Sequence, residues 1–249
     1  MTRSMGTTRV ALISDLHGND IALEAVLADI AKRGVEQTIC LGDVVTLGPR
    51  PLAMLERLQR AGCVCVLGNH DEFMFEPDLA RQYSQIPVLL DAIDWCRAQL
   101  PRDAIDYLRT FRASYELPLD SRHQLFLFHG TPESNSVDLL ATTPPEVLDD
   151  MLAGRHASVM AGGHTHIQML RQHRGLLLVN PGSVGMPFRE YVGGGPPHVL
   201  PHAEYAIVGA SSGALSVRLQ RVALDKAQLR QAALAVDNPI CASLAQMYG

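Results

Sequence analysis

Asp15-Leu-His17 and Gly68-Asn-His-Asp71 are the stretches that decide the fold prediction for this chain. Each follows directly on an apolar run rich in β-branched residues, Val10–Ser14 in the first case and Cys63–Leu67 in the second. Such runs predict buried strands. Open α/β sheets bind their ligands at the carboxyl ends of the strands. We therefore expect both polar stretches to lie at one edge of a largely parallel sheet.

Three further apolar runs also end in residues that ligate metals. A single polar stretch after a strand is usually an ordinary surface loop. Five such stretches, each after its own predicted strand, favour a metal centre. Apart from Asp71, the five stretches together present two Asp, one Asn and five His side chains. The three further stretches are Gly42-Asp43, His129-Gly130 and Gly163-His-Thr-His166.

The types of side chain restrict the metal. Carboxylate and amide oxygens combined with imidazole, without thiolate, suit a first-row divalent ion. A closed structural zinc site would need four ligands and would usually include Cys. Residues two apart on an extended segment face the same side, so Asp15 and His17 can reach one cavity, as can His164 and His166. Seven ligands and one further His fit two ions that share a carboxylate, a geometry suited to displacement at phosphorus.

These five blocks resemble the calcineurin-like metallophosphoesterases, in which they stand in the same order. The resemblance runs from about residue 8 to about residue 222. It is closest to the compact bacterial branch that contains small phosphodiesterases, because three longer stretches also match. These stretches are Asp15-Leu-His-Gly-Asn19, His129-Gly-Thr-Pro132 and Asn180-Pro-Gly-Ser-Val-Gly185.

The resemblance implies a set of metal ligands and no other cofactor. The ions would be two divalent metals, either Mn, Fe, Ni or Zn, with manganese favoured. One ion would be held by Asp15, His17 and His166, the second by Asn69, His129 and His164, and Asp43 would bridge the two.

It also implies two catalytic residues. His70 would protonate the leaving oxygen or stabilise charge on the phosphoryl oxygens. Asp71 would accept a hydrogen bond from the His70 ring and orient it. A hydroxide bridging the metals would attack phosphorus in line.

The order of predicted elements gives the fold class. Strands at 9–14, 37–41 and 63–67 alternate with helices at 20–33 and from Pro51, which indicates a mostly parallel sheet. Strands near 167–171, 176–179, 203–210 and 214–222 predict a second, largely antiparallel sheet. The expectation is an α/β protein, a four-layer α/β/β/α sandwich with two central mixed sheets. Its 249 residues are expected to form a single domain, 1–249.

Residues 72–120 interrupt the alternation and predict helices near 77–84, 86–98 and 101–110. This helical insert could form a wall or lid over the metals, or an ordinary layer covering the sheet. Its aromatic residues Tyr83, Trp95 and Tyr107 are expected to be packing residues. A last helix is predicted at 225–236, and the tail from residue 238 is expected to be loosely held.

The segment 186–202 departs from the pattern of the compared branch. The sequence there is Met186-Pro-Phe-Arg189, which displaces by one position an Arg that follows Pro in relatives. A contact between this Arg and the site is therefore in doubt. Residues 193–197 are expected to be flexible, and His198 and His202 to be solvated.

Composition excludes some partners. The net charge is −5 and no basic run occurs, so a nucleic-acid duplex is not expected as a partner, although nucleotides remain compatible. No apolar segment approaches the roughly 20 residues that cross a bilayer. The first six residues lack a signal-peptide core, and the Cys count is five, so a reduced, cytoplasmic chain is expected. The sequence predicts no particular oligomeric state.

Three functions follow as hypotheses. The first is a phosphodiesterase acting on a small or nucleotide phosphate ester. The second is a phosphomonoesterase of the protein phosphatase or nucleotide phosphatase type, and it is disfavoured because Leu47 stands where those branches carry a phosphate-binding Arg. The third is a non-catalytic binding scaffold, disfavoured because His70 and every ligand position are filled.

Overall fold

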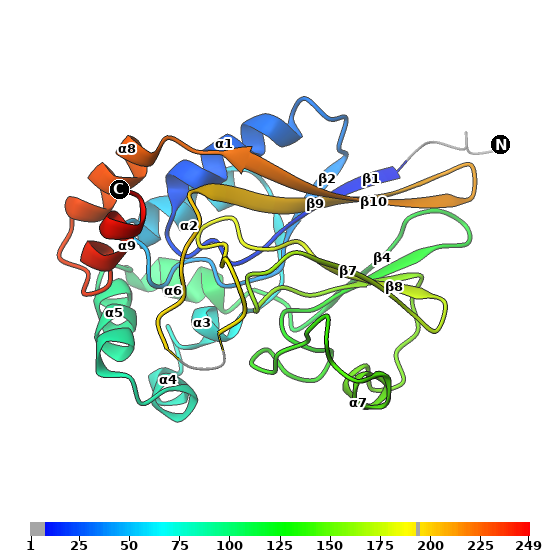
Figure 1. Ribbon diagram of the computed structural model, residues 1–249, viewed down its shortest axis with the longest axis horizontal. Helices are drawn as coiled ribbons and strands as arrows, with labels where there is room; N and C mark the ends of the chain where they lie inside the picture. Colours follow the sequence, from blue (N-terminus) through cyan, green and yellow to red (C-terminus); the bar gives the residue numbers. More distant parts are fainter. Residues whose placement is uncertain (1–7, 193–194) are drawn as a thin grey trace.

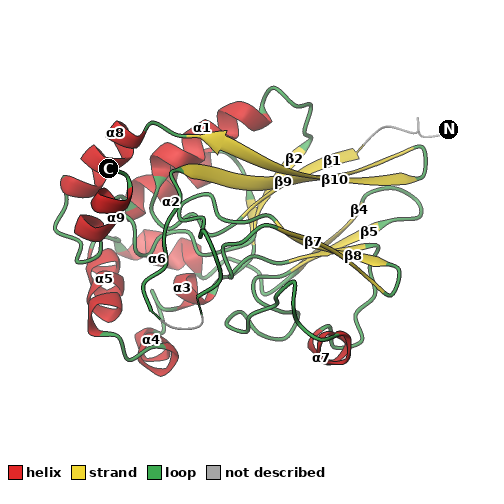
Figure 2. Cartoon of the chain, viewed as in Figure 1, coloured by secondary structure: helices red, strands yellow, loops and turns green. Residues whose placement is uncertain are grey.

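Two five-stranded sheets pack face to face, with helices on their outer sides (Figures 1 and 2). The computed structural model describes residues 8–192 and 195–249. The strand order is β10-β9-β1-β2-β3 in the first sheet and β4-β5-β6-β8-β7 in the second. The expected four-layer α/β/β/α sandwich with two mixed sheets is confirmed.

The first sheet contains the predicted parallel unit. Strands β1 (Thr8–Ile13), β2 (Gln37–Cys40) and β3 (Val64–Cys65) are parallel and are joined through helices α1 (Asp20–Ile30) and α2 (Pro51–Arg60). Both helices pack their apolar faces on the outer side of this sheet. This connectivity places the loops that follow β1, β2 and β3 at one edge of the sheet.

The prediction for the later strands was wrong in part. Strands β9 (His202–Ser211) and β10 (Ala214–Ala223) join the first sheet, where β9 pairs antiparallel with β1. Eight consecutive residues of β9 are buried, which suits a central strand covered on both faces. Strand β10 is more exposed and forms the edge of the sheet.

The second sheet is mixed, so the prediction that it is largely antiparallel was also wrong. Strands β5 (Gln124–Leu127), β6 (Val159–Ala161) and β8 (Leu176–Asn180) are parallel. Helix α7 (Pro145–Met151) lies in the long connection from β5 to β6, and such a crossover is what parallel strands require. Only the outer strands β4 (Tyr115–Pro118) and β7 (Met169–His173) run antiparallel to their neighbours.

The helices predicted in the insert are confirmed. After the short helix α3 (Asn69–Glu72) come α4 (Pro77–Tyr83), α5 (Pro87–Ala98) and α6 (Arg102–Leu108). Pro at the first turn of α4 and α5 suits a position whose N–H has no partner in the helix. Helices α5 and α6 contribute to the same core cluster as α1 and α2, as an ordinary helical layer would.

The carboxyl-terminal tail is ordered, which contradicts the expectation of a loosely held end. Helix α8 (Lys226–Leu234), predicted at 225–236, is capped by Asp225, and it packs on α9 (Cys241–Met247). Leu244 of α9 and Tyr248 at its end, four residues apart and so on one face, are buried in a cluster with Met186 and Val199. In the part of the chain that is described, no helix could span a membrane.

Candidate metal centre

Five loops meet at the edge where the strands of both sheets end. Backbone hydrogen bonds tie the first two loops together, since the Asp15 N–H donates to the Gly42 carbonyl at 2.9 Å and the His17 N–H to the Asp43 carbonyl at 3.0 Å. The His164 N–H donates to Asp15 Oδ2 at 3.1 Å, which joins a loop of the second sheet to a loop of the first. The predicted ligands therefore converge at the junction between the sheets.

The backbone of these loops is unusual. Five of the predicted ligands have a backbone φ between 44° and 69°, in the left-handed region that residues other than Gly rarely adopt. Each such residue costs on the order of 1–3 kcal/mol, which the surrounding structure must offset, and such strain clusters at functional sites. The five residues are Asp15, His17, Asp43, His164 and His166.

One group of ligand atoms lies at the end of β1. The atoms that Asp15, His17, Asp43 and His166 offer all lie within 4.8 Å of one another. Nε2 of His17 is 3.0 Å from Nε2 of His166 and 3.9 Å from Oδ2 of Asp43. Two imidazoles and two carboxylates this close together could hold a cation.

A second group adjoins the first and shares Asp43 with it. Ligand atoms of Asp43, His129 and His164 also lie within 4.8 Å of one another. Nε2 of His129 is 3.4 Å from Oδ2 of Asp43. Asn69 lies beside this group at the start of α3, and its neighbour His70 donates its backbone N–H to Oδ1 of Asp43 at 2.9 Å.

Several buried polar atoms here have no hydrogen-bond partner. They are Oδ1 of Asp15, both amide atoms of Asn69 and Nε2 of His129. A buried polar atom left unsatisfied costs about 1–3 kcal/mol, and a coordinated cation would remove this cost for the oxygen and nitrogen acceptors. With no Cys in either group, the donor set fits first-row divalent metal ions.

The protein also fixes the direction of the rings. Nδ1 of His129 donates to the Leu41 carbonyl at 2.6 Å, and Nδ1 of His166 donates to the Met186 carbonyl at 2.7 Å. Because a carbonyl only accepts, each Nδ1 carries a proton, and Nε2 is the ring atom that faces the site and could bind a metal. Nδ1 of His17 lies 3.2 Å from the Thr46 hydroxyl, so its Nε2 also faces the site.

Charge is concentrated at this centre. Burial and the neighbouring His166 lower the pKa of His17 to about 3. Burial disfavours the charged form of His129, but the carboxylates of Asp43 and Asp15 outweigh it and raise the pKa of His129 to about 9. Burial opposes ionisation of Asp43, yet His129 and His70 hold the pKa of that carboxyl well below its usual range. The centre thus stabilises a negative Asp43 through nearby positive charge.

Asp71 does not have the predicted role of orienting His70. Its Oδ1 accepts from the Val44 N–H at 2.8 Å, and its Oδ2 accepts from the N–H groups of Asp43 at 2.8 Å and Gly68 at 3.2 Å. The carboxylate is fully buried, and Nδ1 of His70 has no hydrogen-bond partner. His70 and Asp71 both lie in the short helix α3, and the Asp71 side chain turns back to the loop after β2. Asp71 therefore fixes the backbone that carries Asp43.

Tyr83 is a site residue that sequence reasoning missed. Its ring centroid lies 6.0 Å from that of His70 and 6.4 Å from that of His164, and the residue is 44% exposed. Partial burial of Tyr83, with Asp43 and Asp138 nearby, raises the pKa of its hydroxyl to about 12, so the hydroxyl stays protonated. The position of α4 directly after His70 was the available signal. Helix α4 therefore forms a wall of the site, while α5 and α6 form the covering layer.

Asp138 was missed as well, and no motif marks it. Its Oδ1 lies 3.3 Å from Nε2 of His164, and its Oδ2 accepts from the Tyr191 hydroxyl at 2.7 Å. The displaced Arg189 instead pairs with Glu190 at 2.8 Å. Within the segment predicted to be flexible, residues 193 and 194 lie outside the described part of the chain.

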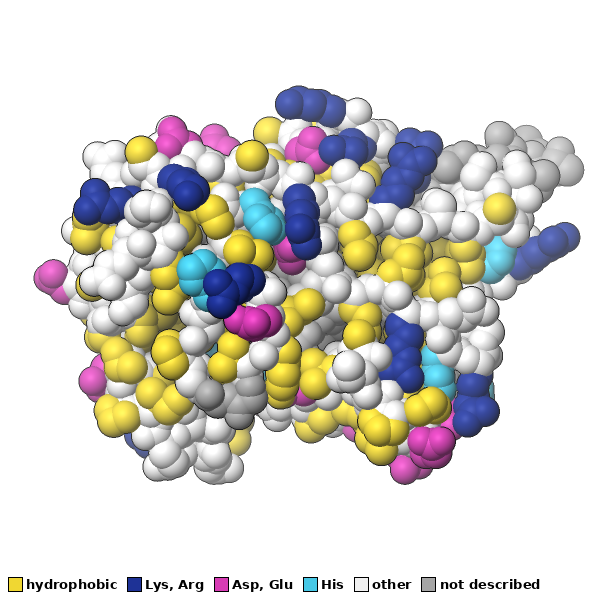
Figure 3. Space-filling view, viewed as in Figure 1, with side chains coloured by type: hydrophobic (Ala, Val, Ile, Leu, Met, Phe, Trp, Pro, Cys, Tyr) yellow, Lys and Arg dark blue, Asp and Glu magenta, His cyan; other side chains and the backbone are white. Residues whose placement is uncertain are grey.

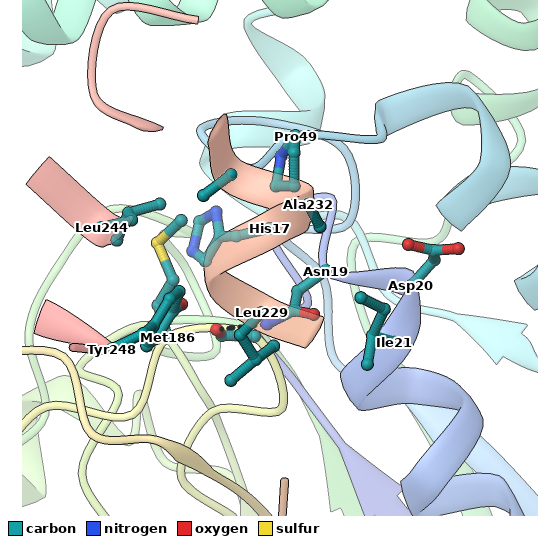
Figure 4. A pocket seen from close by; sticks show the side chains of 12 residues that line it. His17, Asn19, Asp20, Ile21, Pro49, Met186, Leu229, Ala232, Leu244 and Tyr248 are labelled. Atoms are coloured by element: carbon teal, nitrogen blue, oxygen red, sulfur yellow. Dashed lines mark hydrogen bonds between the residues drawn. The ribbon is translucent and has the colours of Figure 1, made fainter. Parts of the chain in front are cut away.

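Behind His17 a small cavity separates the centre from the carboxyl-terminal helices. Figure 4 shows His17 and Asn19 facing Leu229 of α8 and Leu244 of α9 across it. Its volume of about 10 Å³ suffices for about one water molecule, so it is a packing gap that holds no substrate. The face shown in Figure 3 carries scattered basic and acidic side chains without a continuous basic stripe.

Comparisons with known proteins agree with this geometry. The chain is 28% identical over 202 residues to the uncharacterized protein MJ0912 of Methanocaldococcus jannaschii, covering 75% of this chain and 79% of that one. It is 26% identical over 189 residues to phosphodiesterase YfcE of Escherichia coli, covering 72% and 80%. A metallophosphoesterase structure from Sphaerobacter thermophilus superposes with a TM-score of 0.73 at 24% identity, covering 97% and 98%, which shows the shared fold.

The family comparison covers most of the chain. The model of the calcineurin-like phosphoesterase superfamily domain matches residues 8–195 and spans all five blocks. The chain therefore belongs to the calcineurin-like phosphoesterase superfamily and is a phosphoric ester hydrolase.

Proposed function

We propose that this protein is a phosphodiesterase that works with two divalent metal ions and hydrolyses a small or nucleotide phosphate ester. The observation that carries the proposal is the pair of adjoining ligand groups that share Asp43. Asp15, His17 and His166 would complete one ion's ligands, and Asn69, His129 and His164 those of the other. The two ions, when bound, supply positive charge against the phosphoryl oxygens and lower the pKa of water in the site.

His70 is the proposed acid at the leaving oxygen. It is nearly buried, its Nδ1 has no protein partner, and its ring lies 5.3 Å from that of His17. Its backbone N–H holds Oδ1 of Asp43, so the imidazole sits beside the shared carboxylate. Burial lowers the pKa of His70 to about 4. The negative charge of a bound phosphate ester beside the ring would raise this pKa again, so that the imidazole can donate a proton to a departing alkoxide.

A diester is favoured over a monoester on two grounds. Leu47 stands where a phosphate-binding Arg is expected in monoesterase branches, and the exposed Arg189 pairs with its neighbour Glu190. A dianionic monoester gains most from a guanidinium. The similarity to phosphodiesterase YfcE supports the same choice. Protein or nucleotide phosphatase activity is the alternative.

The test uses metal content and turnover together. With Mn²⁺ added, the protein should hydrolyse bis(p-nitrophenyl) phosphate faster than p-nitrophenyl phosphate. His70→Ala should keep its metal content and lose most turnover, whereas Asp43→Ala should lose both. Preference for the monoester would move the assignment to a phosphatase. Inactivity on both substrates with full metal content would indicate a scaffold.

Three further expectations belong to this proposal. Manganese is the favoured ion among Mn, Fe, Ni and Zn. The chain is taken as one domain with the helical insert at 72–120 inside it. A cytoplasmic location fits its five free cysteines, since reducing compartments keep thiols unpaired.

A further inference from the structure

A carboxylate stands at the mouth of the metal centre, beyond the predicted ligands. Asp138 is 40% exposed at its side chain, and its Oδ1 lies 3.3 Å from Nε2 of His164. The ligand groups that include His164 do not include Asp138. Its half-exposed carboxylate therefore adjoins this ligand group without belonging to it, so the phosphoryl group of a bound substrate would lie near its charge.

This carboxylate is held in position by a second loop. The Tyr191 hydroxyl donates to Oδ2 of Asp138 at 2.7 Å and so joins the segment after β8 to the loop after β5. No Lys or Arg balances the charge there, because within residues 8–192 and 195–249 none pairs with Asp138, His164 or Tyr83. A substrate meets a fixed negative charge that repels additional negative charge on its phosphate.

Beside Asp138 lies a groove of about 150 Å³. No charged side chain lines it, and its wall is fixed because the Arg171 guanidinium donates to the carbonyls of Leu140, Ala141 and Thr143. The groove has room for a ring-sized group. Its apolar lining comes mainly from Leu139, Leu140, Ile167, Met169 and Tyr191.

We infer that the mouth of the metal centre recognises phosphodiesters whose second substituent is uncharged and apolar. Asp138 acts against the second negative charge of a monoester, and the adjacent groove receives the substituent that a monoester lacks. The inference rests on the proposed phosphodiesterase function and names the class of ester that the same site takes.

The role of the Asp138 charge is tested by calorimetry, which measures how tightly inorganic phosphate and dimethyl phosphate bind to the Mn²⁺-loaded protein. Asp138→Asn should bind inorganic phosphate about tenfold more tightly, because one repulsive charge is removed, while the affinity for dimethyl phosphate should change less than about threefold. Glu133→Gln, in the same loop and 66% exposed at its side chain, is the matched control and should change neither. An unchanged phosphate affinity in Asp138→Asn overturns the role of the carboxylate.

The groove is tested with two diesters that share one leaving group. The wild type should hydrolyse phenyl p-nitrophenyl phosphate with a kcat/KM about tenfold above that for methyl p-nitrophenyl phosphate, because the phenyl ring buries apolar area. Leu140→Trp should fill the groove and bring the ratio close to one. Leu170→Trp, at an exposed position of β7 outside the groove, should keep it.

The two failures can be told apart. A ratio near one in the wild type, or an unchanged ratio in Leu140→Trp, overturns the role of the groove while diesterase activity stands. A wild-type protein that binds metal but hydrolyses neither diester refutes the proposed function. In that case the phosphate affinities still decide the role of Asp138.

Discussion

The substitution Asp71→Asn separates two roles for a buried carboxylate beside the centre. In the structure, Oδ2 accepts from the N–H groups of Asp43 and Gly68, and Oδ1 accepts from that of Val44. An Asn amide can keep its oxygen at the first position, but its NH₂ group then faces the Val44 N–H. One buried donor loses its acceptor, and such a loss costs about 1–3 kcal/mol.

This cost should reduce both stability and metal affinity. The metal-free loop can relax to satisfy the Val44 N–H, and metal binding must then restore the strained position of Asp43. If the whole cost falls on binding, the affinity for Mn²⁺ drops by about 5- to 150-fold. Turnover at saturating metal should stay within about threefold, because Nδ1 of His70 makes no hydrogen bond and the Asp71 carboxylate accepts only from backbone N–H groups.

Denaturant unfolding of the metal-free protein and calorimetric titration with Mn²⁺ measure the two effects. Asp78→Asn, an exposed carboxylate at the start of α4, is the matched control. Unchanged stability and affinity, with turnover about 100-fold lower at saturating metal, would refute this reasoning. That outcome would restore Asp71 as the group that orients His70.

Three other predictions test the loops, an ion pair and the domain organisation. Gly68→Ala should strongly lower Mn²⁺ content by metal analysis, because the added Cβ overlaps the Asp43 carboxylate and backbone; Gly62→Ala, with open space around it, should not. The Arg33 guanidinium lowers the pKa of Asp29 below its usual 3.8, so this pair stabilises the fold above about pH 4 and less as pH falls further. The stability gap between wild type and Asp29→Asn, from urea unfolding, should narrow below about pH 4, and a widening gap would contradict this. A single domain predicts one transition in chemical denaturation followed by fluorescence and circular dichroism, whereas two separated transitions would show independent units.

Local pattern determined much of the fold. The alternation of apolar strands and amphipathic helices up to β3 gave the parallel unit, since adjacent elements there pair with their sequence neighbours. The prediction from local pattern was wrong for β9, which pairs with β1 almost 200 residues earlier in the chain. Hydrophobic periodicity describes which face of a strand is buried but not which partner it meets, so the assignment of strands to sheets depended on tertiary packing.

For the site, the sequence by itself determined which side chains could serve as ligands, because motif spacing after a strand fixes residue type and position. The structure brings all seven predicted ligand positions to the junction of the two sheets. Only the tertiary structure decided the role of Asp71, whose carboxylate turns to the backbone of another loop. Only the tertiary structure showed that Tyr83 and Asp138 lie beside the metal centre. Each contacts His164 from a distant part of the chain, and no sequence spacing relates these segments.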